Sequence, residues 1–316
     1  MKHQLAFLFF LLLNIVSLAQ RREEIFDFSF NPVKQGGYYY VVTEKKDSGW
    51  MQQAWFLSQK TLYMEGFYKD ESCKIEHGLF KWYHPNGYLR TQMRYVDGYR
   101  EGVFIRYDEQ GRLRDSVNYL RGHKLGIGYS FHENGYMSDS TNFDGKGNGL
   151  QVGWYDDGSL EAAGYWTQDT LKKGRWKYYH RNGKVMATED YDANGKLVVY
   201  NCYDAQGVQL DTALCREREA SVDASYWRRF LERNLGPLVE QKAKEGISGN
   251  FTVVVRFLVN EDGSISDIVP LTRYGHGIEE GVIKIFKHVP KWNPGMQHGR
   301  KVKSYHTQPI TFVIAN

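Results

Sequence analysis

The chain has 316 residues, of which 41% are hydrophobic and 25% charged, so it is long enough for two folded domains and too apolar to be intrinsically disordered. Its formal net charge of +4 is small for this length and argues against a nucleic-acid-binding protein, which needs a concentrated basic face. The 23 tyrosines and 32 glycines favour many short strands joined by tight turns.

The N-terminus has the pattern of an export signal. A lysine precedes an apolar run from Leu5 to Leu13, and Ser17 and Ala19 occupy the two positions that signal peptidase reads. The run is shorter than the ~20 residues that a helix needs to span a bilayer, and no cysteine follows it to carry a lipid anchor. The sequence therefore predicts a signal peptide over residues 1–19 and a mature protein free in the periplasm. Retention of this segment as an inner-membrane anchor is the alternative.

Residues 20–50 form a lead-in to the rest of the chain. The stretch DFSFNPVKQGGYYYVVTEK is compatible with a first pair of strands and also with a mobile segment. The sequence leaves both open.

A turn motif recurs through the middle of the chain. It reads YHPNGYL at Tyr83–Leu89, YDEQGRL at Tyr107–Leu113 and YHRNGKV at Tyr179–Val185. The turn glycines follow one another at intervals of 24, 24, 23, 25, 12 and 12 residues: Gly87, Gly111, Gly135, Gly158, Gly183, Gly195 and Gly207. A fixed period indicates one small structural unit repeated many times.

Each unit has the composition of an antiparallel strand pair. Asn-Gly and Asp-Gly supply the positive φ angles that tight hairpin turns require, and aromatic and β-branched residues flank them. A second turn falls between successive motifs, around Gly98 and Gly122. The pattern predicts two strands per repeat, over a region from residue 51 to residue 215.

This region resembles MORN-type repeats over about Trp55–Asp211. The resemblance implies a twisted antiparallel ribbon of roughly ten to thirteen strands spaced ~4.8 Å apart. A single hairpin is not stable alone, so neighbouring repeats must stabilise one another. The sequence leaves open whether the ribbon is a stiff spacer or a binding face.

The residue after the aromatic of each turn alternates between two types: His84, Asp108, His132, Asp156 and His180. A stacked row of such side chains raises the possibility of a metal site. Histidine and aspartate are, however, ordinary first residues of turns, where they accept or donate hydrogen bonds to the backbone. Neighbouring units would also hold them too far apart for a shared ion. The sequence favours the turn role and predicts no metal.

The three cysteines do not form a C-x-x-C pair, which argues against a zinc or thioredoxin-like site. Cys202 and Cys215 are close enough in sequence to form a small disulfide loop in an oxidising compartment. Two ordinary thiols are the alternative, because geometry decides the matter.

After Cys215 the pattern changes to that of a helix. Trp227, Leu231, Leu235 and Leu238 recur at helical spacing and predict one apolar face. Asp223 and Ser225 are the candidate N-caps of this helix. Pro237 predicts a division of the stretch into two short helices.

Strands, a helix and a last strand follow. GNFTVVVRFLVN alternates apolar residues onto one face, NEDG forms a hairpin turn, and SISDIVPL is the partner strand. The apolar spacing from Ile278 to Val289 predicts an amphipathic helix that Pro290 ends. Ile310, Phe312 and Ile314 alternate in a final strand. The predicted order is helix, strand, strand, helix, strand. The fold class is therefore mixed, with an antiparallel hairpin array followed by a small α+β domain over residues 216–316.

This C-terminal region resembles the TonB C-terminal domain over Tyr226–Asn316. The resemblance is carried by GISGNFTVVVRFLVNEDGSISDI, by the run from YGHGIEEGVIKIF to PKWNPGMQHGRKV, and by the ending YHTQPITFVI. It implies a protein-binding module whose last strand lies at a sheet edge. An extended peptide, in the family the N-terminal box of an outer-membrane transporter, adds there as a further strand.

By position, this edge includes Lys303, Tyr305 and Gln308, which we predict as partner contacts. The alternative is that Tyr305 packs in the core and that Lys303 is a solvated surface charge.

No motif predicts an enzyme. The sequence contains no G-x-S-x-G, H-E-x-x-H or phosphate-binding loop, and the G-x-G at Gly126–Gly128 falls in the repeats without a following helix. We therefore expect no catalytic residue, cofactor or small-molecule substrate.

The expected role is that of a periplasmic adaptor that binds an outer-membrane TonB-dependent transporter or another envelope protein. A TonB energy transducer has a retained membrane anchor and a Pro- or Lys-rich linker, and this chain has only 7 prolines. The alternatives are a scaffold that uses the repeats as its interaction surface, with peptidoglycan as one partner, and an anchored energy transducer.

Overall fold

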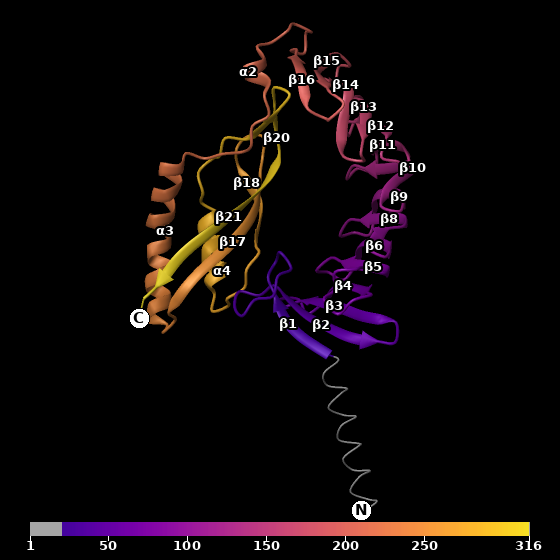
Figure 1. The fold of residues 1–316 in the computed structure, drawn as a ribbon. Helices are drawn as coiled ribbons and strands as arrows, with labels where there is room; N and C mark the ends of the chain where they lie inside the picture. The colour runs from indigo at the N-terminus through magenta and orange to yellow at the C-terminus, as the bar shows by residue number, and fades with distance from the viewer. Residues whose placement is uncertain (1–20, 316) are drawn as a thin grey trace, which may run out of the picture. The chain divides into compact units, whose positions relative to one another are not determined.

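The computed structural model describes residues 21–315 (Figure 1), so the predicted signal peptide lies outside the described residues. The chain forms two compact units. The first contains residues 39–200 together with the described residues before 26, and the second contains 26–38 and 201–316. The division falls near residue 200 rather than at 215, and it assigns part of the lead-in to the second unit. No helix among the described residues is both long enough and apolar enough to cross a membrane.

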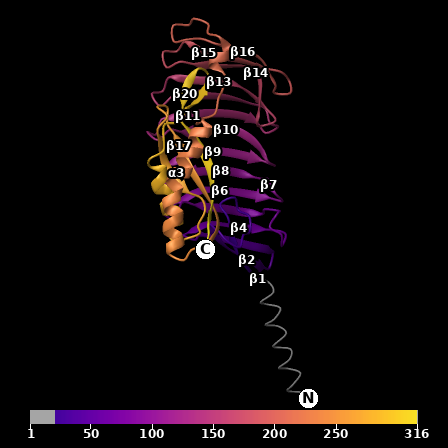
Figure 2. The same ribbon diagram turned by 90° about the vertical axis from the view of Figure 1, so that its left-hand side faces the viewer.

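The first unit is built on one antiparallel sheet of 16 strands that follow one another in chain order, with only the two-residue β7 off the main path. Figure 2 shows these strands as successive rungs. The strands are β1 (Arg21–Phe26), β2 (Tyr39–Lys46), β3 (Gly49–Phe56), β4 (Leu62–Tyr68), β5 (Gly78–Tyr83), β6 (Leu89–Val96), β7 (Tyr99–Arg100), β8 (Gly102–Tyr107), β9 (Leu113–Leu120), β10 (His123–Phe131), β11 (Met137–Asp144), β12 (Gly149–Trp154), β13 (Leu160–Thr167), β14 (Leu171–Tyr179), β15 (Val185–Tyr191) and β16 (Leu197–Cys202). The sheet thus confirms the hairpin array and begins before the repeats, because the lead-in supplies β1 and β2.

The backbone conformation of the turns explains why successive strands of this sheet pair in chain order. Asp97 and Gly98 have φ angles of 54° and 81°, and Arg121 and Gly122 have 48° and 89°. Two consecutive positive φ angles are the geometry of the type I′ turn, whose twist matches that of the strands it joins. All seven glycines of the recurring turn motif also have positive φ. The predicted turns are therefore confirmed.

Glycines inside the strands, unlike those in the turns, leave room for aromatic rings of neighbouring strands. A Cβ built at Gly66 would lie 2.1 Å from the ring of Phe80, one at Gly149 would lie 2.5 Å from that of Phe143, and one at Gly164 would lie 2.1 Å from that of Trp176. In each case the ring of a neighbouring strand lies flat over the glycine Cα. Phe80, Phe143 and Trp176 are at most 3% exposed, so glycine is what lets a single sheet bury large rings without a second layer.

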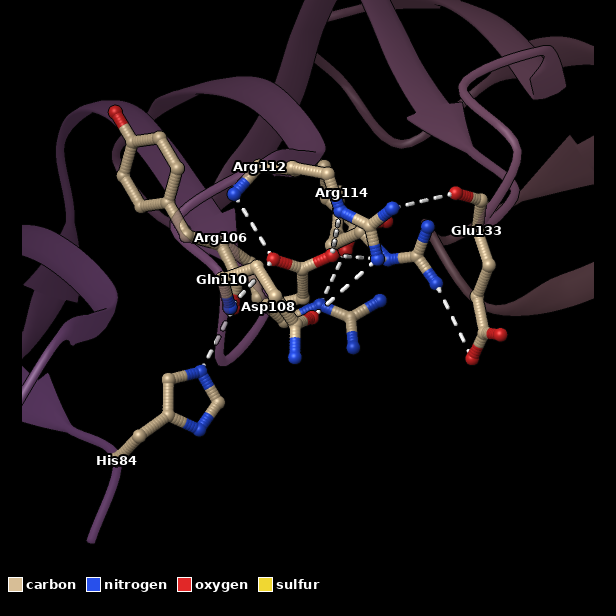
Figure 3. Close-up of polar contacts among 9 residues, drawn as sticks. His84, Arg106, Asp108, Gln110, Arg112, Arg114 and Glu133 are labelled. Carbon is tan, nitrogen blue, oxygen red and sulfur yellow. Dashed lines mark hydrogen bonds and ion pairs between the residues drawn. The ribbon is translucent and has the colours of Figure 1, made fainter. Parts of the chain in front are cut away.

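The histidine turns bond forward to the next turn of the stack. His84 Nε2 lies 3.0 Å from the carbonyl oxygen of Tyr107 (Figure 3). The side-chain amide of Asn86 donates to the carbonyl of Glu109 at 2.8 Å. His132 and Asn134 repeat this pair of contacts at 2.8 and 2.7 Å. The hydrogen bonds of these side chains therefore connect each of these turns to the next one in the sheet.

The aspartate turns bond to themselves. Asp108 Oδ1 accepts hydrogen bonds from the backbone N–H groups of Gln110 and Arg112, at 3.0 and 2.9 Å, while its Oδ2 lies 2.8 Å from Arg112 Nε. Arg112 also donates to the Glu133 carbonyl of the following turn, and Arg114 lies 3.8 Å from the Glu133 carboxylate (Figure 3). His84, Asp108 and His132 therefore bond to the backbone of turns, as the sequence predicted. Asp156 instead pairs with Arg181 at 2.6 Å, and the neighbouring Asp157 accepts the backbone N–H of Ser159 at 2.9 Å.

The aspartate turns predict a pH dependence of stability. Hydrogen bonds from the Asn148 side chain and from the backbone of Lys146 and Asn148 lower the pKa of Asp144 below its ordinary 3.8. A lowered pKa in the folded state adds stability above pH 3.8, and this stability is lost as the pH falls through the folded-state pKa. We expect Asp144→Asn to lower the melting temperature at pH 7, and this difference to shrink as the pH falls below 3.8 towards the folded-state pKa, measured by circular dichroism. A difference that does not shrink would contradict this assignment.

A disulfide closes the end of the repeats. Cys202, at the end of β16, is bonded to Cys215, at the end of the short helix α2 (Thr212–Cys215), and both are fully buried. This bond resolves the alternative that the sequence left open. It joins two segments of the second unit, and the boundary between the units lies just before Cys202.

The second unit is a three-stranded antiparallel sheet with two helices on one face. Its elements are α3 (Ala224–Lys244), β17 (Gly249–Val259), β18 (Ile265–Pro270), α4 (Ile278–Phe286), the hairpin β19 (Gly295–Gln297) and β20 (Arg300–Val302), and β21 (Ser304–Ile314). The order in the sheet is β18-β17-β21. Alternate residues of β17 and β21 form one buried cluster with both helices: Trp227, Leu235, Leu238, Phe251, Val253, Val255, Phe257, Val259, Ile278, Val282, Phe286, Ile310, Phe312 and Ile314. The predicted order of elements is confirmed.

The expectation that Pro237 divides the first helix was wrong. α3 is one helix of 21 residues with Pro237 inside it, capped by Asp223, whose carboxylate accepts from the N–H of Tyr226 at 2.7 Å. A proline costs one helical hydrogen bond. Leu235 and Leu238, on either side of it, are both buried in the same core, and their burial favours a continuous helix.

Residues 26–38 belong to this second unit. Tyr274 lies within 3.2 Å of the position that a Cβ at Gly36 would occupy, and the backbone N–H of Tyr38 donates to the carbonyl of Phe26 at 2.7 Å. No periodic pattern in the sequence predicts this packing, because the segment has no regular secondary structure.

Candidate protein-binding edge

The last strand of the second unit is paired on one side only. β21 pairs with β17 over eleven residues without a bulge, from Ser304 opposite Val259 to Ile314 opposite Gly249. No strand among the described residues pairs with the other side of β21. An edge of this kind presents backbone N–H and C=O groups to which another strand can bond.

The hydrogen bonds of the central strand identify which residues of β21 face outward. Val254 directs both backbone groups away from β21, because its carbonyl accepts from Leu271 at 2.7 Å and its N–H donates to Thr272 Oγ1 at 3.2 Å. Its partner in β21, Pro309, must therefore direct its own backbone away from β17. By alternation, the same holds for four further residues of the strand, namely Tyr305, Thr307, Thr311 and Val313.

The side chains of these outward residues lie on the exposed face of the sheet. Tyr305 is 64% exposed and Val313 60%, whereas Ile310, Phe312 and Ile314 point into the core. The guanidinium carbon of Arg256 lies 5.5 Å from the centre of the Tyr305 ring, so the ring also makes a cation–π contact. The first outward-facing residue of the edge is therefore an exposed tyrosine whose ring contacts Arg256.

A pocket of about 630 Å³ borders the first half of this edge. Its walls are Ser304–Thr307 of β21, the extended segment Glu217–Ala220, and Gly295–Gln297 of β19 with Val302. Arg218 exchanges both backbone hydrogen bonds with Met296, at 3.0 and 2.8 Å. This segment thus forms a second strand-like wall opposite β21.

The pocket lining includes both aromatic and charged side chains. The ring of His306, which lines the pocket, lies 4.7 Å from that of Trp292 and 5.5 Å from that of Phe257, measured between centroids. Glu217 and Glu219 are exposed lining residues, and the Gln297 side-chain amide donates to Glu217 at 3.3 Å. The arrangement suits an extended peptide, which has both apolar and polar groups to satisfy.

The residues predicted from the sequence lie along this edge. Lys303 is exposed between β20 and β21, and Tyr305 is on the surface rather than in the core. Gln308 donates its amide N–H to the carbonyl of the next residue, Pro309, at 3.1 Å. Partner contact by Lys303, Tyr305 and Gln308 stays a prediction.

Sequence reasoning missed two parts of the edge. Pro309 was a detectable signal, because a proline inside a strand pattern indicates an edge strand. The segment Glu217–Ala220 gave no signal, since it lies some 85 residues earlier in the chain and reaches the pocket through its pairing with β19.

Comparison with protein families supports both resemblances. Residues 240–314 match the family described as the Gram-negative bacterial TonB protein C-terminal, and residues 76–97 and 172–192 match the MORN repeat variant. A search of curated proteins found no match. The chain thus carries MORN-type repeats followed by a TonB-type C-terminal domain, which indicates a TonB-like protein of the cell envelope.

Proposed function

We propose that this protein is an exported periplasmic adaptor that binds an outer-membrane TonB-dependent transporter through the free edge of β21. The observation that carries this proposal is the unpaired edge beside a pocket, in a domain of the TonB type. The function that we propose for the protein is binding rather than catalysis. An added strand gains main-chain hydrogen bonds from the edge and specificity from the pocket.

The disulfide supports the proposed location. The bond between Cys202 and Cys215 is buried and joins two segments of the second unit. Structural disulfides persist in oxidising compartments such as the periplasm and are rare in the cytosol. Such a bond is consistent with export through a cleaved signal peptide. N-terminal sequencing of the mature protein tests whether the signal peptide is cleaved. Retention of Met1 would instead support an anchored protein.

Site-specific photo-crosslinking in cells tests the binding edge. A photoreactive residue at Lys303 is expected to capture a TonB-dependent transporter, identified by mass spectrometry, because Lys303 lies at the start of the exposed edge. The same residue at Arg106, which is exposed on β8 of the first unit, is the matched control and is expected to capture none. Capture of the transporter from Arg106 alone would reject the edge as its binding site.

A second function, that of a scaffold, is favoured by one feature of the repeats. Four aliphatic residues at equivalent positions, each following a strand glycine, are 38–57% exposed: Leu79, Val103, Ile127 and Leu150. Their side chains leave the same face of the sheet at every second strand of the main path, which makes a regularly spaced apolar row. A photoreactive residue at Val103, within this row, that captures an envelope protein when Lys303 captures none would support this role.

A further inference from the structure

The free edge of β21 is interrupted at its centre. Pro309 directs its backbone outward, as argued above, and a proline nitrogen has no hydrogen to donate. The carbonyl of Pro309 already accepts the amide of Gln308 at 3.1 Å. At this position an incoming strand finds no donor, and one lone pair of the carbonyl oxygen is already used. Proline is a known device for blunting exposed strand edges.

The interruption leaves two short outward-facing stretches, which differ in their surroundings. Tyr305 and Thr307 lie on the wall of the 630 Å³ pocket. Thr311 and Val313, on the other side of Pro309, do not line it. A strand beside the second stretch would gain backbone bonds alone, whereas a strand beside the first would also place side chains in the pocket.

The opposite wall of the pocket is the segment Glu217–Ala220. Arg218 uses its own N–H and C=O on Met296 of β19, and Ser221 uses both of its groups on Asn293. The side chains of a strand beside Tyr305 and Thr307 would therefore meet a second wall of the pocket, whereas those of a strand beside Thr311 and Val313 would not.

We propose that the partner peptide docks as a short strand along Ser304–Thr307 only, and that Pro309 with Gln308 marks the end of the paired register. This inference rests on the proposed function and specifies which part of the edge performs it. The ligand is an extended segment with about four paired residues, which fits a short terminal box better than a long strand. The same interruption prevents β21 from pairing along its whole length with a second copy of the chain.

Two matched proline variants test the assignment. Thr307→Pro and Thr311→Pro each remove one outward-facing N–H, and both threonines are exposed and keep the same relation to β17. The probes are synthetic ten-residue peptides that tile the N-terminal boxes of the source organism's outer-membrane transporters, with binding to the full chain measured by fluorescence anisotropy. We expect Thr307→Pro to weaken binding about tenfold, the effect of one lost bond in a desolvated contact, and Thr311→Pro to change it less than about twofold.

Two results would overturn the inference, and they are distinguishable. Equal weakening by both variants, with unchanged circular dichroism spectra, would reject the restriction to the first stretch and leave the proposed function standing. Absence of binding by every peptide to the unchanged protein would reject the proposed function together with the inference.

Amide hydrogen exchange gives a second readout that does not depend on the proline variants. Peptide binding is expected to slow exchange at Tyr305 and Thr307 and to leave Thr311 and Val313 unchanged, because only the first two would donate to the peptide. In the double variant Gln308→Ala/Pro309→Thr, which restores a donor and frees the carbonyl, protection is expected to spread to Thr311. Protection of Thr311 in the unchanged protein would contradict the assignment.

Discussion

Replacing Gly164 by alanine is expected to destabilise the repeat sheet by roughly 2–3 kcal/mol, although alanine is ordinarily the better residue in a strand. The added Cβ would lie 2.1–2.5 Å from three atoms of the Trp176 indole. That ring is 3% exposed, and its Nε1 donates to the carbonyl of Tyr165 at 2.9 Å, so it cannot move without losing both packing and a hydrogen bond. Thermal unfolding of the full chain measures the effect.

Gly153→Ala is the matched control for this substitution. Gly153 also lies inside a strand of the first unit without a positive φ angle, but its added Cβ would meet only the end of the Asp139 carboxylate, at 3.1 Å. We expect it to cost less than about 1 kcal/mol. In a Trp176→Ala background the cost of Gly164→Ala is expected to disappear, as a double-mutant cycle would show. Equal costs at Gly164 and Gly153 would contradict the stacking of rings over glycines.

Removal of the disulfide by Cys202→Ser with Cys215→Ser is expected to destabilise the second unit by roughly 3 kcal/mol. The two cysteines are 13 residues apart in sequence, and their bond restricts the unfolded chain. Both sulfurs are fully buried, and Cys215 Sγ lies 3.4 Å from the position of a Cβ at Gly299, so two serine hydroxyls there would also be poorly accommodated. Urea unfolding followed by tryptophan fluorescence measures the loss.

Cys73→Ser is the control for the disulfide. Cys73 is half-buried in the first unit and makes no disulfide bond, so its replacement is expected to shift the unfolding midpoint little. If the double serine variant unfolded at the same urea concentration as Cys73→Ser, the bond would have no role in stability.

Local chemistry made much of the fold predictable. The Asn-Gly and Asp-Gly turns carry their conformational requirement in the glycine itself, so the repeat period predicted two antiparallel strands per repeat without knowledge of any contact. The lead-in strands that bring the sheet to 16 strands lie outside this period. Local pattern likewise predicted β17, where alternation over Phe251–Val259 directly reports burial on one face. Asp223 was recognisable as an N-cap because its side chain acts within three residues.

Predictions that depended on distant contacts were less successful. Pro237 is unfavourable in a helix on local grounds, yet the burial of Leu235 and Leu238 holds α3 together. Nothing near Gly66 and Gly164 in the sequence distinguishes them, since the rings that require them belong to other strands. The assignment of residues 26–38 to the second unit likewise depends on contacts such as that between Gly36 and Tyr274.

The sequence by itself determined that this protein has a hairpin array followed by a small α+β domain, and which strand comes last. These features follow from turn glycines and from the spacing of apolar residues, which act over a few positions. Only the tertiary structure decided that the outward backbone groups of β21 belong to Tyr305, Thr307, Thr311 and Val313, and that Glu217–Ala220 borders the pocket beside its first half. The direction of a backbone group depends on which strand pairs with which, and pairing joins residues far apart in the chain.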